Sequence, residues 1–191
     1  MTDENDTKTE ETGGGVAKTL LKARKVLICE EIDQKMAKRV TAELLALAEE
    51  SDDDITLFIN SQGGHVEAGD TIHDIIKFIN PTVKVVGTGW VASAGTHIFL
   101  AADKANRYCL PNTRFLIHQP SGGIGGKVTD IAIQAQQIER MRERLAKVIA
   151  DATGTKIEKV REDIERDHWL NTDEAVSYGI LSKVITSQAD L

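Results

Sequence analysis

Short apolar runs alternate with longer segments of helical periodicity in this chain, and that alternation limits the folds it can adopt. Val26–Cys29, Ile55–Ile59 and Val83–Val86 have the length and composition of buried strands. Apolar side chains then recur at helical spacing after each of the first two runs: Met36, Val40, Leu44 and Leu47 after the first, and Ile72, Ile75, Ile76 and Ile79 after the second. Strands that alternate with helices predict βαβ units and a mainly parallel α/β sheet.

The second half of the chain continues this pattern. Arg107–Leu110, Phe115–Ile117 and Leu181–Ile185 are further predicted strands. A long helix that closes near Gly154 is predicted by apolar residues on one face: Ile131, Ala135, Ile138, Met141, Leu145, Val148 and Ile149. A shorter helix is predicted from about Lys156 to Glu165, and another precedes the last strand.

The length of 191 residues suits a single domain with one sizeable core. The first 15 residues hold five acids, a triple glycine and very few apolar side chains, so they have little to bury. We therefore expect residues 1–25 to be an acidic, flexible segment and residues 26–191 to form the domain.

The net charge of -7 argues against a nucleic-acid partner, because phosphate backbones are bound by clustered lysine and arginine. The sequence contains no pattern typical of a secretory signal and no apolar run of the length that a membrane span needs. We therefore expect a cytoplasmic protein without a membrane partner.

The two cysteines give no sign of a metal site or a disulfide framework. Cys29 and Cys109 each lie in an apolar, strand-like context, without the spacing of metal ligands. We expect both thiols to be reduced and buried.

One serine lies where a strand is predicted to give way to a helix. Gly87 and Gly89 follow the run Val83–Val86 and favour a sharp turn, and an alanine-rich helical segment begins after Ser93. The first N–H groups of a helix have no internal partner and favour negative charge, so this position suits a nucleophile and its oxyanion. An ordinary helix N-cap is the alternative reading of Ser93.

A serine nucleophile needs a base, and the chain offers five histidines. His118 directly follows a predicted strand and is the favoured base. His97, four residues after Ser93, is the alternative. The other histidines have no obvious role: His73 and His168 are expected at the surface or an interface, and His65 adjoins a glycine loop. Asp167, just before Trp169, is one candidate among many acids for the carboxylate that orients the imidazole.

Four segments of the chain together resemble the ClpP family, the proteolytic subunits of Clp proteases. They are INSQGGHVEAG, GWVASAG, RYCLPNTRFLIHQPSGG and ERDHWLNTDEAVSYGILSKVI. The resemblance extends from about Val26 to Ile185, in the order and spacing of the family. It implies a ClpP/crotonase-like fold with repeated ββα-type units and a protruding handle, which the positions 119–153 would form.

The resemblance also implies the roles of individual residues. Ser93 matches the nucleophile, His118 the general base and Asp167 the orienting carboxylate. The backbone N–H groups of Gly64 and Ala94 match the oxyanion hole. No metal and no cofactor is implied.

Further positions match the family's substrate strand and ring interface. The residues implied to pair with a substrate backbone are Gly122, Gly123, Ile124 and Gly125. Asp130 and Arg166 match an ion pair between two stacked heptameric rings. Loss of that ion pair is expected to loosen both the assembly and the neighbouring Asp167.

The resemblance implies three kinds of partner. Unfolded proteins and peptides would be the substrates, and an AAA+ unfoldase of the ClpX, ClpA or ClpC type would dock at Phe58, Phe78 and Tyr108. The rings would consist of this chain alone or of this chain with a second ClpP-type subunit.

The sequence is therefore compatible with three alternative functions. The first is a serine endopeptidase subunit of a Clp-type protease. The second is a catalytically silent structural or regulatory subunit of a mixed ring assembly, and the third is an acyl-CoA enzyme of the related crotonase group. The complete set of Ser93, His118 and Asp167 favours the first, because an acyl-CoA enzyme has little use for it.

Overall fold

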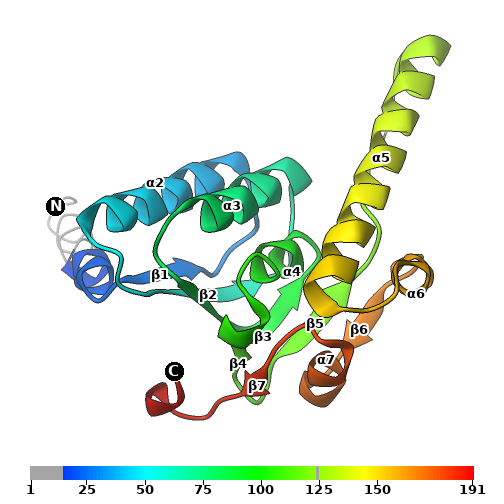
Figure 1. Ribbon diagram of the computed structural model, residues 1–191. Coiled ribbons are helices and arrows are strands. Elements are labelled where there is room, and N and C mark those ends of the chain that lie inside the picture. The colour runs from blue at the N-terminus through cyan, green and yellow to red at the C-terminus, as the bar shows by residue number, and fades with distance from the viewer. Residues whose placement is uncertain (1–14, 124) are drawn as a thin grey trace, which may run out of the picture.

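A parallel sheet runs through the body of this computed structural model, which describes residues 15–123 and 125–191 (Figure 1). Its main path has the order β1-β2-β3-β4-β7, and every neighbouring pair along it is parallel. These strands are β1 (Lys25–Ile28), β2 (Ile55–Ser61), β3 (Val83–Ala92), β4 (Arg107–Cys109) and β7 (Lys183–Val184). The prediction of a mainly parallel α/β sheet is confirmed.

A branch of the sheet leaves the second half of β3. The first half of β3 pairs with β4, whereas Trp90–Ala92 pairs with β5 (Arg114–Ile117). A short strand, β6 (His168–Leu170), then adds to β5 in the antiparallel direction. Because β3 pairs with both β4 and β5, the branch point lies within β3, between Gly87 and Trp90.

Some helices begin or end at residues that cap them. Asp33 precedes α2 and accepts a hydrogen bond from the Met36 N–H at 2.7 Å, and Gly154 ends α5 in the left-handed conformation. The helices are α2 (Gln34–Glu50), α3 (Val66–Phe78), α4 (Ala94–Phe99), α5 (Val128–Thr153), α6 (Ile157–Asp163) and α7 (Thr172–Tyr178), with short 3-10 turns at Lys104–Asn106 and Gln188–Asp190.

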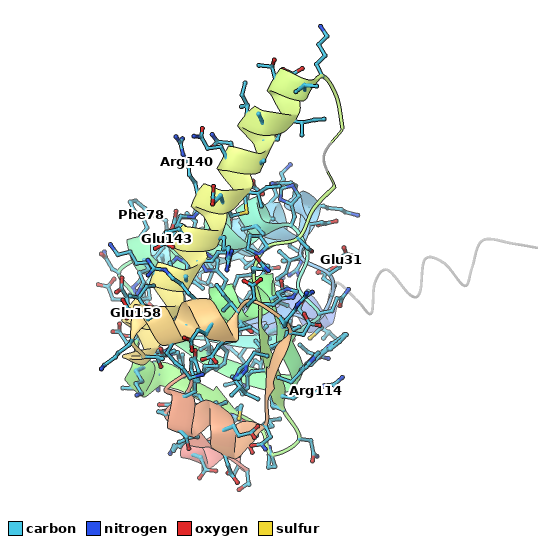
Figure 2. All side chains as sticks on the ribbon, turned by 90° about the vertical axis from the view of Figure 1, so that its right-hand side faces the viewer. Glu31, Phe78, Arg114, Arg140, Glu143 and Glu158 are labelled. Atoms are coloured by element: carbon cyan, nitrogen blue, oxygen red, sulfur yellow. The ribbon has the colours of Figure 1, made fainter. Side chains whose placement is uncertain are left out.

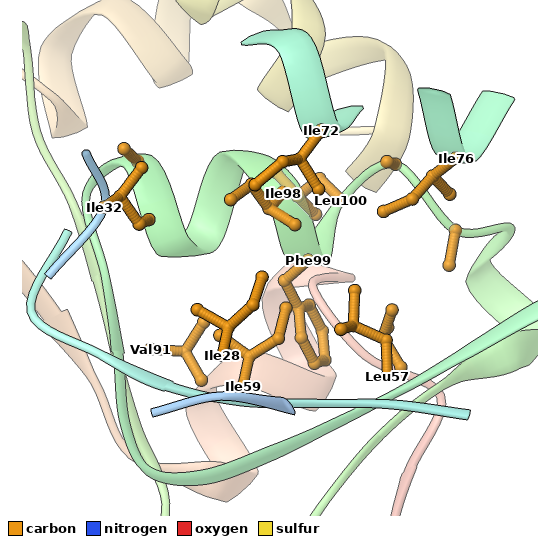
Figure 3. Packing of buried hydrophobic residues seen from close by; sticks show 14 of the residues in the cluster. Ile28, Ile32, Leu57, Ile59, Ile72, Ile76, Val91, Ile98, Phe99 and Leu100 are labelled. Atoms are coloured by element: carbon orange, nitrogen blue, oxygen red, sulfur yellow. The ribbon is translucent and has the colours of Figure 1, made fainter. Parts of the chain in front are cut away.

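The core lies between the sheet and the helices α2, α3 and α4 (Figure 1). Figure 3 shows strand side chains that meet side chains from α3 and α4: Ile28, Leu57, Ile59 and Val91 from the strands, and Ile72, Ile76, Ile98 and Phe99 from the helices. All of these side chains are aliphatic or aromatic, and all except Ile76 are fully buried. The helix that follows Ser93 is therefore fixed by core packing.

The helix α5 projects from the body as a handle (Figure 1). Only Ala146, Ile149 and Thr153, all near its C-terminal end, are buried, while Val128 is 85% exposed. The long helix predicted from the apolar face is confirmed, but much of that face has no partner within the described chain.

Two sequence-based expectations about strands are wrong. The turn expected at Gly87–Ser93 does not occur there, because β3 continues past both glycines to Ala92 and the chain turns only at Ser93. The strand β6 was not predicted, because three residues are too few to show a strand period.

Two further expectations concern single residues and the N-terminal segment. Cys109 is buried as expected, but Cys29 is exposed because it follows the last residue of β1. Of the segment expected to be flexible, residues 1–14 lie outside the described residues, and residues 15–22 form a helix.

The Phe99–Phe115 contact ties α4 to β5. The helix α4 follows the turn at Ser93, and β5 carries the Leu116 carbonyl that accepts from the Ser93 N–H. The rings meet edge to face with centroids 5.1 Å apart, and both are fully buried. We predict that Phe115→Ala lowers the free energy of unfolding by about 3–5 kcal/mol, because it removes this contact and leaves a cavity. Chemical denaturation measures the change. Phe78→Ala is the matched control, since Phe78 is 77% exposed and its loss should change the free energy by less than about 0.5 kcal/mol. Equal effects of the two substitutions would contradict this account.

Candidate active site

The turn between β3 and α4 holds Ser93 in an unusual backbone conformation. Its φ is 56° and its ψ is -119°, a region that residues other than glycine rarely adopt. The Ser93 N–H donates to the carbonyl of Leu116 on β5 at 3.0 Å, which fixes the turn against the branch of the sheet. The N-cap alternative is not supported, because the Ser93 side chain caps no N–H of α4.

Three side chains from three different elements form one hydrogen-bonded set. His118 follows β5, and its Nε2 lies 2.8 Å from Ser93 Oγ. Its Nδ1 lies 2.9 Å from Oδ1 of Asp167, which directly precedes β6. The imidazole can therefore take a proton from the serine while the carboxylate holds its other nitrogen.

The segment that carries Asp167 is anchored from the residue after His118. The Gln119 N–H donates to the Ile164 carbonyl at 2.7 Å, and its side-chain amide donates to the Glu165 carbonyl at 2.9 Å. These bonds bring the chain before β6 alongside the end of β5. The Asp167 side chain itself is 65% exposed.

The glycine loop after β2 packs directly against the Ser93 turn. A Cβ added to Gly63 would lie only 2.7 Å from Ser93 Cβ, and the positive φ of Gly63 and Gly64 excludes most other residues. Within the described chain, no acceptor bonds to the N–H of Gly64 or of Ala94. Two free backbone donors beside a serine hydroxyl are the requirement for an oxyanion hole.

A pocket opens beside the serine and the imidazole. Most of its wall is apolar: Val66, Ala94, Ile117, Pro120, Leu145 and Ile149. Leu145 and Ile149 come from the base of α5, so the handle helix forms part of the wall. The pocket is therefore a mainly apolar hollow next to the serine and the imidazole.

The alternative base, His97, faces a different set of groups. Its Nε2 lies 2.9 Å from Asp70 Oδ1, and its ring stacks on that of His73 with centroids 4.5 Å apart. Asp70 also pairs with Arg144 of α5. Burial acts to raise the pKa of Asp70, but its contacts with His97 and Arg144 outweigh this and hold the pKa below its usual value.

The surface position expected for His73 is wrong, because its side chain lies inside this cluster and the residue is 9% exposed. The sequence gave no signal of the cluster, since its members come from three helices. Burial, and next the neighbouring His97, hold the pKa of His73 below its usual value of 6.5.

The residues implied for substrate pairing lie in the irregular segment between β5 and α5. Gly122, Gly123 and Gly125 are exposed there, and Ile124 lies outside the described residues. Asp130 on α5 and Arg166 before β6 are both exposed, and they do not pair with each other within the described chain.

The residues implied for unfoldase docking lie on two elements of the sheet and one helix end. Phe58 of β2 and Tyr108 of β4 are both in register with Val86 of β3, one on each side, and both are half-buried. Phe78 is the last residue of α3 and projects from the outer surface of the body (Figure 2).

Two features are absent from the part of the chain that the structure describes. No helix in that part of the chain is both long enough and apolar enough to cross a membrane. In residues 15–123 and 125–191, no three or more histidine, cysteine or acidic side chains are grouped to hold a metal ion.

The close packing of the glycine loop on the serine turn can be tested with one methyl group. We predict that Gly63→Ala lowers the free energy of unfolding by roughly 1–3 kcal/mol and slows the reaction of Ser93 with a fluorophosphonate, because the new Cβ must displace either the turn or the loop. Denaturation and labelling rates measure the two effects. Gly15→Ala is the matched control, since a Cβ there meets no atom within 4 Å. A Gly63→Ala protein as stable and as reactive as the wild type would disprove the packing.

The buried His73 should make stability depend on pH. The unfolded chain takes up a proton on this histidine below about pH 6.5, whereas the folded chain, with its lowered pKa, resists protonation. The wild-type free energy of unfolding should therefore fall as the pH drops below 6.5. In His73→Phe this slope should be shallower, by up to about 1.4 kcal/mol per pH unit. Denaturation from pH 8 to pH 5 measures both slopes, and identical slopes would rule out the buried, uncharged histidine.

Comparisons with known proteins agree with this geometry. The sequence profile of the family described as Clp protease matches residues 8–188. "ATP-dependent Clp protease proteolytic subunit 3" of Rhizobium etli is 52% identical over 99% of this chain and 98% of its own length. "ATP-dependent Clp protease proteolytic subunit" of Paracoccus denitrificans is 57% identical over 92% of this chain and 88% of its own.

A solved structure supports the same assignment. ClpP1 from Listeria monocytogenes superposes with a TM-score of 0.84 at 54% identity, covering 92% of this chain and 99% of that one. The family match extends over far more than half of the sequence, and the fold and the order of the strands that carry the three side chains agree with it. The chain therefore belongs to the Clp protease family.

Proposed function

We propose that this chain is a serine endopeptidase subunit of a Clp-type protease, which hydrolyses unfolded polypeptide to short peptides. The observation that carries the proposal is the hydrogen-bonded set in which His118 lies 2.8 Å from Ser93 Oγ and 2.9 Å from Asp167. Relatives of this chain are named proteolytic subunits of ATP-dependent Clp proteases, and that name agrees with serine-based hydrolysis of peptide bonds.

In this proposal His118 first acts as the base. Its Nε2 takes the Ser93 proton as Oγ attacks the substrate carbonyl, and Asp167 stabilises the imidazolium that forms. The N–H groups of Gly64 and Ala94 bind the oxyanion of the tetrahedral intermediate.

The second half of the reaction returns the enzyme to its starting state. His118 gives its proton to the leaving amine, and the peptide bond breaks to leave an acyl-enzyme on Ser93. Water, activated by the same imidazole, then attacks the ester and releases the peptide acid. The side chains already present supply every proton transfer, so the cycle needs no metal or cofactor.

The substrate would bind as an extra strand. The exposed segment with Gly122, Gly123 and Gly125 offers backbone N–H and C=O groups beside the Ser93 pocket, and we extend the site to Ile124. Pairing through the main chain would accept many sequences, so selection would fall to the apolar pocket.

The assembly belongs to the same proposal. The uncovered face of α5, the exposed Asp130 and the exposed Arg166 suit contacts between two rings of seven subunits, of this chain alone or with a second ClpP-type subunit. An AAA+ unfoldase would dock at Phe58, Phe78 and Tyr108 and supply the ATP-driven unfolding. No observation favours the catalytically silent alternative.

The proposal predicts that each member of the set is required for peptide hydrolysis. Ser93→Ala and His118→Ala should each lower kcat by roughly 10³-fold or more, and Asp167→Asn should lower it by roughly 10³- to 10⁴-fold because it disturbs the imidazole orientation. Ser93→Ala should also abolish labelling by a fluorophosphonate. Fluorogenic peptide hydrolysis and intact-mass labelling measure these effects.

The matched controls replace the same residue types elsewhere. Ser177→Ala and Asp173→Asn alter exposed residues of α7 that do not line the pocket and should leave kcat within about twofold. If the wild-type assembly hydrolyses no peptide and Ser93 is never labelled, the peptidase proposal fails and a structural subunit takes its place.

A further inference from the structure

A guanidinium group lies against two indole rings on the branch of the sheet. Arg114 Cζ is 5.5 Å from the centre of the Trp90 ring and 4.5 Å from that of Trp169. The two indoles are 6.3 Å apart and nearly parallel, with an angle of 6° between their planes. A cation within about 6 Å of the centre of an aromatic ring is attracted to it, so Arg114 is attracted to both indoles. We refer to these three residues as the Trp–Arg–Trp stack.

The stack takes one residue from each of the three strands that present the proposed catalytic side chains. Trp90 lies on β3, three residues before Ser93; Arg114 lies on β5, four residues before His118; and Trp169 lies on β6, two residues after Asp167. The stack therefore lies on the same three strands that lead to the proposed catalytic side chains, two to four residues away along each segment.

The strand β6 is held by its pairing with β5, by the buried Leu170 and by the contact of Trp169 with Arg114. It is three residues long and pairs only with β5, so it is an edge strand. The Asp167 carboxylate is 65% exposed, and its only side-chain hydrogen bond within the described chain is to His118. Gln119 anchors the chain on the near side of Asp167, through Ile164 and Glu165. On the far side there are two anchors: Leu170 is buried in the core, and Trp169, which is 40% exposed, lies against Arg114.

We propose that Arg114 is a positioning residue, which clamps β6 to β5 and β3 through the two tryptophans and so holds Asp167 at hydrogen-bonding distance from His118. Figure 2 shows Arg114 at the surface of the body, at the end away from the tip of α5. Arg114 does not line the pocket and contacts none of the three reacting side chains. Its effect on Asp167 therefore passes through the two tryptophans. The inference rests on the proposed peptidase function, which it deepens.

The test compares two replacements of the same arginine in the full-length assembly. Arg114→Met keeps an unbranched, flexible side chain but loses the cation, and we expect the rate of Ser93 labelling by a fluorophosphonate, and kcat for a peptide, to fall about tenfold with KM unchanged. Arg114→Lys keeps a cation beside the rings and should retain most of the wild-type rate. Lys38→Met, which removes a positive charge from an exposed position on α2, should have no effect.

A double-mutant cycle separates positioning from general damage. If Arg114 acts through Asp167, Arg114→Met should cost nothing more in an Asp167→Asn background, because the carboxylate it positions is already absent. An equal tenfold loss in both backgrounds would overturn the proposal. So would a loss in which activity falls only as far as the assembly dissociates, measured by native mass on the same samples.

A second readout does not depend on activity. Hydrogen exchange of the amides in residues 168–170 should be faster in Arg114→Met than in the wild type and near wild type in Arg114→Lys. Unchanged exchange in Arg114→Met would overturn the clamp even where the enzyme is active. If wild-type Ser93 is never labelled, the peptidase function fails, and the exchange experiment still decides whether the stack holds β6.

Discussion

The path of β3 past Gly87 and Gly89 to Ser93 is the constraint on which the site depends. The strand pairs with β4 up to Gly87 and with β5 from Trp90 onward, so the two glycine positions lie where the sheet divides. Gly89 has a φ of 58°, and a Cβ there would lie 2.9 Å from Asn60 Oδ1. A Cβ on Gly87 would approach Val91 to 3.0 Å. Glycine at these two positions lets β3 continue past the point where the sheet divides and reach Ser93 beside the end of β5.

A few hydrogen bonds fix the position of Ser93 at the end of this strand. The Ser93 N–H and the Thr96 hydroxyl both donate to the Leu116 carbonyl, and the Thr96 hydroxyl also lies 2.7 Å from the Val91 carbonyl. These bonds join the start of α4 to both strands of the branch. Beneath them the core is aliphatic apart from the Phe99–Phe115 pair, so α4 cannot shift without opening a cavity. The positive φ of Ser93 persists because the surroundings fix it from both sides.

The handle helix takes part in the site as well as extending from it. Leu145 and Ile149 form part of the pocket wall, and Arg144 pairs with Asp70, which in turn contacts His97 of the same wall. Arg142 of the same helix pairs with Glu165, two residues before Asp167. The base of α5 therefore contacts both the pocket wall and the segment that carries the proposed orienting carboxylate. A movement of the handle would reach both.

The sequence by itself determined the order of most strands and helices, the parallel sheet and some helix ends, because these depend on residues close together in the chain. The cap at Asp33 and the left-handed Gly154 are examples, since each acts within one turn of its helix. The resemblance to a known family named Ser93, His118 and Asp167, whereas the pattern alone left His97 as a second base and left the choice of carboxylate open. Only the tertiary structure decided that His118 contacts Ser93, that His73 is buried, and that β3 continues beyond its glycines. Each of these depends on side chains brought together from distant segments, and a local pattern carries no information about such contacts.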